Sequence, residues 1–207
     1  MLWVKLFWVK IKLSWMKKLI GLKKTKTAVF ISGTGSNLKN LIKFSKKKNS
    51  PISVELIISN NRNAMGLKYS RKYNIQKKIV SFENNKLAEK KVFNFLFEKK
   101  IKFICLAGFM KILSKNFIKK FKGKIINIHP SLLPKYKGLN THKKAIENND
   151  KFAGCSVHFV TSKLDSGKII MQKKVKIEKR DTITSLAKKV LKKEHLLYPA
   201  AIKKIYN

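Results

Sequence analysis

Carboxylates are scarce in this 207-residue chain, which carries ten Asp and Glu against 49 Lys and Arg and has a formal net charge of +39. Only three of the 49 basic residues are arginines, namely Arg62, Arg71 and Arg180. Proteins that read base edges or clamp phosphates favour the planar guanidinium group. We therefore interpret the charge as a compositional bias toward lysine rather than as a nucleic-acid or membrane surface. Such a charge would still attract phosphorylated, carboxylate-rich small molecules.

Cysteine is equally rare, and the two residues, Cys105 and Cys155, form no Cys-x-x-Cys pair. This number and spacing argue against a zinc site. Both cysteines lie in apolar stretches, "FICLAG" and "AGCSVHF". We expect buried, reduced thiols in a cytoplasmic protein.

Long uninterrupted apolar runs are also missing. The first 18 residues, "MLWVKLFWVKIKLSWMKK", are aromatic and apolar but are broken by lysines, which argues against a signal peptide or a transmembrane helix. A basic interfacial helix and a misplaced translation start before Met16 both stay open. We treat residues 1–24 as an unassigned extension and residues 25–207 as one domain, with no stable membrane insertion.

Strand and helix patterns alternate along the rest of the chain, which predicts an α/β fold with a doubly wound, mostly parallel sheet. Ligands bind such sheets beyond the carboxyl ends of the strands. The closing segment, 182–205, is predicted as a long helix capped by Asp181. Strands are expected at 27–32, 53–59, 78–82, 101–109 and 124–129, with an antiparallel pair at 154–160 and 167–177 near the C-terminal end.

The stretch "SGTGSNL" follows the first predicted strand and opens a helix. Gly33 and Gly35 let the backbone approach an anion, and Ser36, Asn37 and the helix N-terminus supply hydrogen-bond donors. Leu38 stands where a dinucleotide fingerprint has its third glycine. The pattern indicates a site for a phosphate monoester, and a tight turn without a ligand is the alternative.

Asn127 and His129 lie two apart on a predicted strand, so their side chains point the same way, and Pro130 stops the strand beyond them. An amide and an imidazole aimed at one point can polarise a carbonyl and handle a proton. Asp165 is one of only three aspartates and lies in a turn, where a solvated turn former is the ordinary reading. His158 is expected to face inward from the strand before it.

Six sequence blocks occur in order between about Thr27 and Ile205. They are "ISGTGSNL", "ISNNRNAMGL", "LAGFMKILS", "INIHPSLLPKYKGLNTHKKAIE", "GCSVHFVTSKLDSGKIIMQ" and "KKEHLLYP". Taken together, these blocks resemble one family, phosphoribosylglycinamide formyltransferase. The resemblance implies a Rossmann-like fold and transfer of a formyl group from 10-formyltetrahydrofolate, the co-substrate, to the amine of 5'-phosphoribosylglycinamide in purine biosynthesis.

The resemblance also assigns roles to matching positions. Asn127, His129 and Asp165 are implied as the catalytic residues. Contacts with the ribonucleotide are implied for Gly35, Ser36, Asn37, Leu191, Lys192, Lys193 and Glu194. Contacts with the folate are implied for Lys86, Met110, Lys111, Ile112, Leu113, Asn127, Thr161, Ser162, Lys163, Leu164 and Asp165.

Three positions depart from the family pattern, because Lys111 and Lys86 stand where arginines are expected and Asn140 stands where histidine is common. None of these changes removes a catalytic group. The resemblance implies no metal, small-molecule substrates, no specific nucleic acid, and a monomer or homodimer.

Two related families and one unrelated class are alternatives. Formyltetrahydrofolate deformylase carries an added N-terminal domain and lacks the "GSNL" loop, and methionyl-tRNA formyltransferase carries an added C-terminal domain. A basic nucleic-acid-binding protein on a similar scaffold would not require Asn127, His129 and Asp165 to converge.

Overall fold

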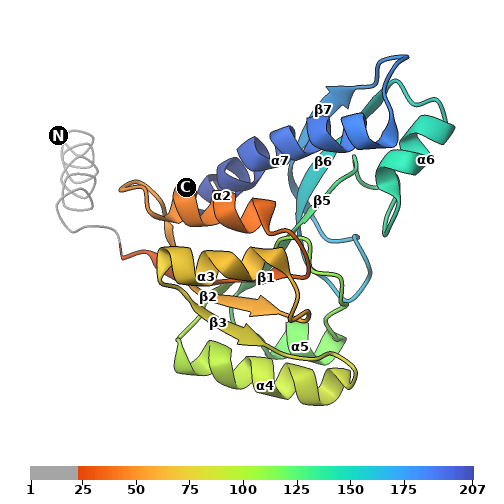
Figure 1. Cartoon of the computed structure of the whole chain (residues 1–207). Coiled ribbons are helices and arrows are strands. Elements are labelled where there is room, and N and C mark those ends of the chain that lie inside the picture. Colours follow the sequence, from red (N-terminus) through yellow and green to blue (C-terminus); the bar gives the residue numbers. More distant parts are fainter. Residues whose placement is uncertain (1–22) are drawn as a thin grey trace, which may run out of the picture.

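A seven-stranded sheet organises the chain in the computed structural model, which describes residues 23–207 (Figure 1). The strand order is β3-β2-β1-β4-β5-β6-β7. Strands β1 to β5 pair in parallel, and β6 and β7 run antiparallel to their neighbours. The strands are β1 (Thr25–Ile31), β2 (Ile52–Ser59), β3 (Gln76–Ile79), β4 (Phe103–Leu106), β5 (Lys124–His129), β6 (Phe152–Phe159) and β7 (Ile169–Lys176). The predicted fold class is confirmed.

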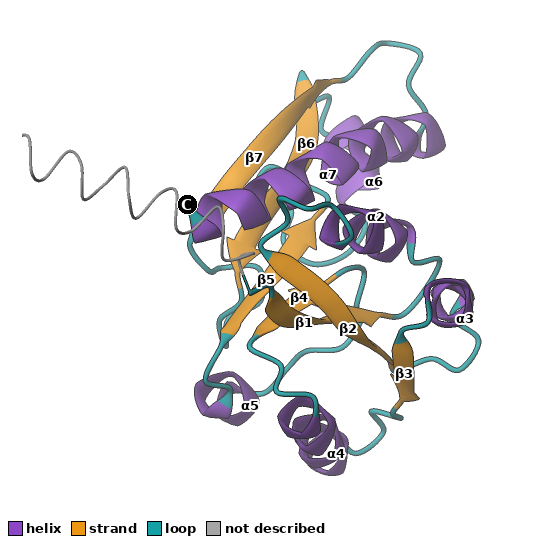
Figure 2. Cartoon of the chain, turned by 90° about the vertical axis from the view of Figure 1, so that its left-hand side faces the viewer, coloured by secondary structure: helices purple, strands orange, loops and turns teal. Residues whose placement is uncertain are grey.

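Helices cover both faces of the sheet (Figure 2). Alternate residues of β1 face opposite layers, because Val29 packs with α2 and α7 whereas Phe30 packs with α4 and α5. Strands buried on both faces read as continuous apolar runs, as β1 does. The helices are α2 (Ser36–Ser45), the 3-10 turn η1 (Met65–Leu67), α3 (Lys68–Tyr73), α4 (Asn85–Glu98), α5 (Lys115–Lys120), α6 (Thr141–Glu147) and α7 (Ile183–Tyr206).

The closing helix α7 is anchored to the middle of the sheet by Tyr198. Its hydroxyl lies 2.9 Å from the carbonyl oxygen of Leu106 on β4 and 3.3 Å from that of Ile126 on β5. The predicted helix is confirmed, but the predicted cap, Asp181, is wrong. Thr182 caps α7 in a reciprocal box with Ser185, while Asp181 accepts hydrogen bonds from the hydroxyl of Ser185 and from Lys189.

The carboxyl ends of β1 and β4 are joined directly, since the Ser32 N–H donates to the Gly108 carbonyl at 3.0 Å. The strand predicted over 101–109 ends earlier, at Leu106, because Gly108 has a φ of 73° and turns the chain into a loop. Neighbouring strands whose connections leave in opposite directions create a crevice at this edge. Every loop that follows β1, β4 or β5 therefore starts beside the same opening.

Both cysteines are free and buried, as predicted. Burial raises the pKa of the Cys155 thiol to about 12, and the pKa of Cys105 is raised further by burial, against a smaller opposing contact with Tyr198. Neither thiol forms a reactive thiolate near neutral pH.

The predicted N-terminal extension lies almost entirely outside the described residues. Within residues 23–207, no helix combines the length and apolar character needed to cross a membrane.

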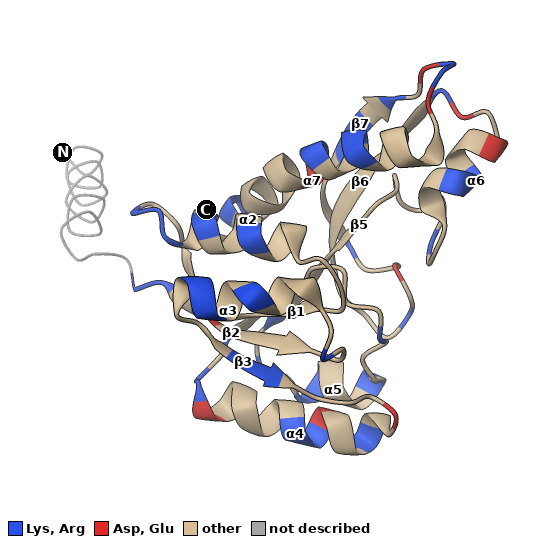
Figure 3. Cartoon of the chain, viewed as in Figure 1, with Lys and Arg blue, Asp and Glu red and all other residues tan. Residues whose placement is uncertain are grey.

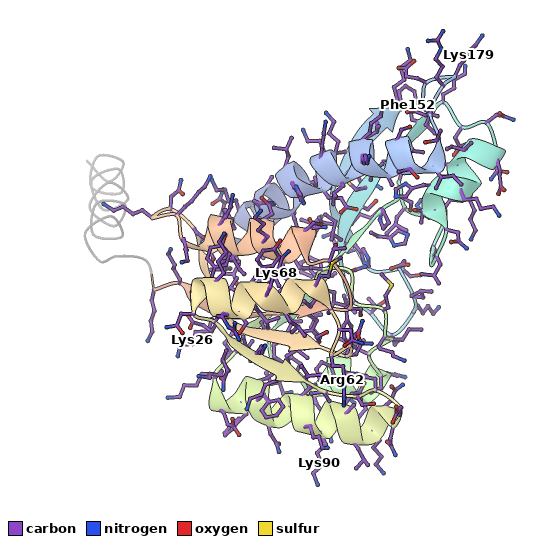
Figure 4. All side chains as sticks on the ribbon, in the orientation of Figure 1. Lys26, Arg62, Lys68, Lys90, Phe152 and Lys179 are labelled. Carbon is purple, nitrogen blue, oxygen red and sulfur yellow. The ribbon has the colours of Figure 1, made fainter. Side chains whose placement is uncertain are left out.

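Lys and Arg residues lie on the helices of both layers and on strands of the sheet rather than on one element (Figure 3). The labelled residues Lys26, Lys68, Lys90 and Lys179 come from β1, α3, α4 and the loop before α7, and all four are exposed (Figure 4). This distribution supports the interpretation of the charge as a compositional bias.

The turn after β1 contains Gly33 and Gly35, and only the second position requires glycine. This difference gives a test of how the turn packs. Gly35 has a φ of 71°, and a Cβ there would lie 2.6 Å from the Cα of Gly66, whereas a Cβ on Gly33 would meet nothing within 4 Å. We expect Gly35→Ala to lower the free energy of unfolding by at least about 1–2 kcal/mol. The matched control, Gly33→Ala, should change it by less than about 0.5 kcal/mol. Urea unfolding of both variants checks this, and equal effects would contradict the packing described here.

Candidate active site

A cleft of about 1060 Å³ opens at the carboxyl edge of the parallel strands. Its wall is formed by the loops that follow β1, β4 and β5, by the loop between β6 and β7, and by one side of α7. Of the predicted site residues, those lining it are Gly35, Ser36, Asn37, Met110, Lys111, Ile112, Leu113, Asn127, His129, Thr161, Lys163, Leu164, Asp165, Leu191 and Glu194. Lys86, Ser162, Lys192 and Lys193 do not line the cleft, and all four are exposed.

The turn after β1 brings the N-terminus of α2 to the cleft. Gly35 takes the left-handed conformation just before Ser36, and the first helical hydrogen bond runs from Lys39 N–H to the Gly35 carbonyl. The amides of the first helical turn have no partner inside the helix and carry the positive end of its dipole. This end of α2 can therefore bind an anion such as a phosphate.

Asn127 lies at the centre of the polar part of the cleft. Its Nδ2 atom is 3.2 Å from Nε2 of His158 on the antiparallel neighbour β6 and 3.4 Å from Oδ1 of Asp165. The Nδ1 atom of His158 lies 2.9 Å from the carbonyl oxygen of Phe159. A carbonyl can only accept, so Nδ1 holds a hydrogen, and Nε2 faces both Nδ2 of Asn127 and Oδ1 of Asp165.

His129 is buried at the end of β5 and faces oxygen atoms with both ring nitrogens. Nε2 is 2.8 Å from the carbonyl oxygen of Tyr136, and Nδ1 is 3.3 Å from Oδ2 of Asp165. The Tyr136 carbonyl can only accept, so Nε2 holds a hydrogen. Nδ1 is then the ring atom that can exchange a proton on the side of Asp165.

Asp165 joins the two histidines. Its Oδ2 accepts a hydrogen bond of 2.9 Å from the Gly138 N–H, and its Oδ1 is 3.6 Å from Nε2 of His158. Burial by itself raises the pKa of the Asp165 carboxyl, but His158, the Gly138 amide and His129 together outweigh burial and lower the pKa below its usual value. The group is thus a carboxylate at neutral pH, placed to accept or relay a proton.

The other end of the polar wall holds a second carboxylate, Glu194 on α7. It is 7% exposed, and its Oε2 accepts a hydrogen bond of 2.7 Å from Nδ2 of Asn37. Burial raises the pKa of Glu194, and the Asn37 bond opposes this shift in part. The Oδ1 atom of Asn37 is buried without a hydrogen-bond partner among residues 23–207, so the pair can accept hydrogen bonds from a ligand that carries donors.

An apolar wall faces the polar groups. Met110, Ile112, Leu139, Leu164 and Ile183 line the cleft although each is at least 48% exposed. An exposed apolar surface of this kind is typical of a binding site for a hydrophobic ligand.

The loop of this wall is fixed to the turn after β1. The Met110 N–H donates to Oγ of Ser32 at 2.7 Å, and Ser32 in turn donates to Asn60. The two parts of the cleft are thus held at a fixed separation.

The geometry described so far agrees with the comparisons to known proteins. A family model described as formyl transferase matches residues 25–202. The chain belongs to the formyl transferase family. The predicted resemblance is confirmed by relatives and solved structures that carry the name phosphoribosylglycinamide formyltransferase.

Three relatives illustrate the extent of the match. The phosphoribosylglycinamide formyltransferase of Haemophilus influenzae is 40% identical over 86% of this chain and 85% of its own length. The crystal structure of phosphoribosylglycinamide formyltransferase from Anaplasma phagocytophilum is 41% identical, with a TM-score of 0.82 over 87% of this chain and 86% of that chain. The human trifunctional purine biosynthetic protein adenosine-3 is 40% identical over 87% of this chain, which spans only 18% of that relative.

Several polar groups of this formyl transferase fold were not predicted as part of the site. They are His158, recognised only as an inward-facing residue, the Tyr136 carbonyl, the Gly138 amide and His142. Nδ1 of His142 is buried with no hydrogen-bond partner in the described part of the chain, and burial together with the nearby His129 lowers the pKa of this ring. Alternation along β6 points to His158, but no sequence signal reveals which backbone groups meet a side chain.

Metal-ligating clusters are absent from the described residues, where no three His, Cys, Asp or Glu side chains group together as ligands. The polar groups listed above contact one another directly.

The raised pKa of Glu194 gives a prediction about stability. The folded state binds this proton more tightly than the unfolded state does, so ionisation of Glu194 lowers stability as the pH rises above its ordinary pKa of 4.5. We expect Glu194→Gln to be more stable relative to the parent at pH 8 than at pH 4. For a chain of this size each kcal/mol shifts the Tm by about 2–4 °C.

Thermal unfolding at both pH values checks this expectation. Glu178→Gln serves as the matched control, since the Glu178 side chain is 55% exposed and its replacement leaves the buried contact between Glu194 and Asn37 intact. A Glu194→Gln variant whose Tm difference does not change with pH would refute the assigned shift.

Proposed function

We propose that this chain transfers a formyl group from 10-formyltetrahydrofolate to the amine of 5'-phosphoribosylglycinamide, without a metal. The observation that carries the proposal is the convergence of Asn127, His129 and Asp165 in one cleft with the N-terminus of α2. The three side chains suit acyl transfer, and the helix N-terminus suits a phosphate. A protein that only bound nucleic acid could use a helix N-terminus for a phosphate but would not need Asn127, His129 and Asp165 to converge.

The two substrates would occupy opposite parts of the cleft. The phosphate of the ribonucleotide would lie at Gly35, Ser36 and Asn37. The hydroxyl groups of its ribose would point toward Glu194. The folate ring would lie along the apolar wall at Met110 to Leu113 and beside Leu164. This arrangement would bring the amine and the formyl carbon together next to Asn127, the residue that lies between the two parts.

The chemistry would run through a tetrahedral intermediate. The neutral amine attacks the formyl carbon, its new C–N bond forms, and the carbonyl oxygen becomes an oxyanion. The 3.4 Å contact of Asn127 Nδ2 with Asp165 is long, so this N–H is available to the oxyanion, together with Nδ1–H of His129.

Collapse of the intermediate completes the transfer. The bond from the formyl carbon to the folate nitrogen breaks, the amine loses one proton and the folate nitrogen gains one. Asp165 would accept or relay the proton from the amine, directly or through a water molecule. The carboxylate is suited to this role because its lowered pKa keeps it ionised at neutral pH.

The activity itself is tested with purified protein, glycinamide ribonucleotide and 10-formyltetrahydrofolate. Loss of the formyl group from the folate should depend on the amine acceptor. Equal rates with and without the acceptor would indicate hydrolysis to formate and would favour a deformylase instead. Absence of turnover together with salt-dependent DNA retention would favour the nucleic-acid-binding alternative.

Replacement of His129 tests the catalytic assignment. Loss of one oxyanion donor costs about 3 kcal/mol, so we expect His129→Ala to lower kcat by at least about 100-fold while the fold is retained. Circular dichroism and thermal unfolding check the fold. Asp165→Asn preserves the shape of the side chain and should also lose most of kcat because the charge is gone. Near-normal turnover of His129→Ala would refute the assignment.

The phosphate contact is tested by the double variant Ser36→Ala, Asn37→Ala. We expect its KM for the ribonucleotide to rise at least about tenfold, because the Ser36 hydroxyl can donate to the phosphate and one hydrogen bond to a charged group contributes about 1.5–3 kcal/mol. Loss of the Asn37 amide also removes the hydrogen-bond donor to the buried Glu194 carboxylate. The KM for the folate should change little. Asn94→Ala, at an exposed asparagine of α4, serves as the control. An unchanged KM for the ribonucleotide would rule out phosphate binding at this turn.

A further inference from the structure

The backbone of the loop after β5 contacts both proposed proton-handling groups within three residues. The carbonyl oxygen of Tyr136 lies 2.8 Å from Nε2 of His129, and the N–H of Gly138 lies 2.9 Å from Oδ2 of Asp165. A change in the backbone at Tyr136 would therefore move the partners of His129 and Asp165 together.

Tyr136 has an unfavourable backbone conformation. Its φ is 54°, in the left-handed region that side chains with a Cβ rarely occupy. Residues in such conformations persist only where their surroundings hold them, and they are concentrated at functional sites. The surroundings of the Tyr136 side chain are thus expected to maintain the position of its carbonyl group.

The side chain of Tyr136 is held from outside the cleft by Asp150. The Tyr136 hydroxyl donates to Oδ2 of Asp150 at 2.9 Å and accepts from Nδ2 of Asn148 at 2.9 Å. The other carboxylate oxygen of Asp150 accepts from Nζ of Lys135, also at 2.9 Å. Both hydrogen-bonding sites of the phenol and both carboxylate oxygens of Asp150 are therefore occupied.

Asp150 is well placed to fix this contact. It follows α6 and precedes β6, its side chain is only 14% exposed, and its N–H donates to the carbonyl of Ala145 in α6. Asp150 does not line the cleft, whereas His129, Gly138 and Asp165 do. The side chain of Asp150 is instead connected to these groups through Lys135 and Tyr136 of the loop.

We propose that Asp150 and Tyr136 are positioning residues, which hold the loop after β5 so that its backbone orients His129 and Asp165 for proton transfer. The inference rests on the proposed function of His129. It goes beyond that function, because neither the Tyr136 phenol nor Asp150 contacts the reacting groups. The geometry that carries it is the unbroken chain of contacts from Asp150 through the Tyr136 hydroxyl, ring and backbone to His129.

The test compares Tyr136→Phe, Asp150→Ala and the double variant with the parent protein. Since displacement of a catalytic group by about 1 Å can cost 100-fold in rate, we expect each single variant to lose about tenfold in kcat. Both KM values should stay within about twofold of the parent, because the substrate contacts are unchanged. The double variant should be no slower than the slower single variant, since the two residues act through one contact.

Two further variants separate positioning from general destabilisation. Asp150→Asn keeps an oxygen that can accept from the Tyr136 hydroxyl, and it should recover most of the activity lost in Asp150→Ala. Glu147→Gln, the matched control, alters a carboxylate of α6 that is 58% exposed, and it should not change kcat. If the kcat of Asp150→Asn is no higher than that of Asp150→Ala, the role of the contact with the Tyr136 hydroxyl is overturned.

A spectroscopic readout makes the inference independent of turnover. In the parent protein the Nε2 hydrogen of His129 should give a protected ring signal by ¹⁵N-edited NMR, because it is bonded to the Tyr136 carbonyl. In Tyr136→Phe and Asp150→Ala this signal should shift and exchange faster with water. If the parent protein is inactive, only the proposed function is refuted. The His129 ring signal of the parent can still be compared with that of the variants, so the positioning role is tested separately.

Parent-like kcat or a parent-like His129 ring signal in both Tyr136→Phe and Asp150→Ala would overturn the positioning role. Additive losses in the double variant would do so as well.

Discussion

Parallel pairing of β1 with β4 and of β4 with β5 is the constraint on which the rest of the structure depends. It places the carboxyl ends of three strands at one edge, and the Ser32–Gly108 hydrogen bond joins the first two loops directly. The anion-binding end of α2, the apolar wall and Asn127 all follow from this arrangement. Antiparallel pairing of β6 with β5 then brings His158 opposite Asn127, and the following loop delivers Asp165.

Five of the ten acidic residues have largely buried side chains in the described fold, although the chain is strongly basic. They are Glu89, Asp150, Asp165, Asp181 and Glu194, with exposed fractions between 4% and 14%. Each accepts hydrogen bonds from named partners, as buried carboxylates must. The lysine-rich surface therefore coexists with a small set of buried carboxylates that hold internal hydrogen bonds.

Local patterns predicted much of this fold and part of the site. The turn at Gly33–Asn37 and the pair Asn127 and His129 could be identified because a strand, a turn and a helix start each have short-range signals. Backbone partners such as the Tyr136 carbonyl could not, since they depend on the path of a loop. Helical spacing explains why Leu191 and Glu194, which lie three apart on one face of α7, line the cleft while Lys192 and Lys193 do not.

The central claim is spatial, namely that Asn127, His129 and Asp165 surround a single formyl carbon. A structure of the chain with glycinamide ribonucleotide and a stable formyl-folate analogue bound would test it most directly. The account predicts the formyl oxygen about 3 Å from Nδ2 of Asn127 and Nδ1 of His129, with the phosphate at the N-terminus of α2. A formyl group bound outside hydrogen-bond reach of both side chains would contradict it.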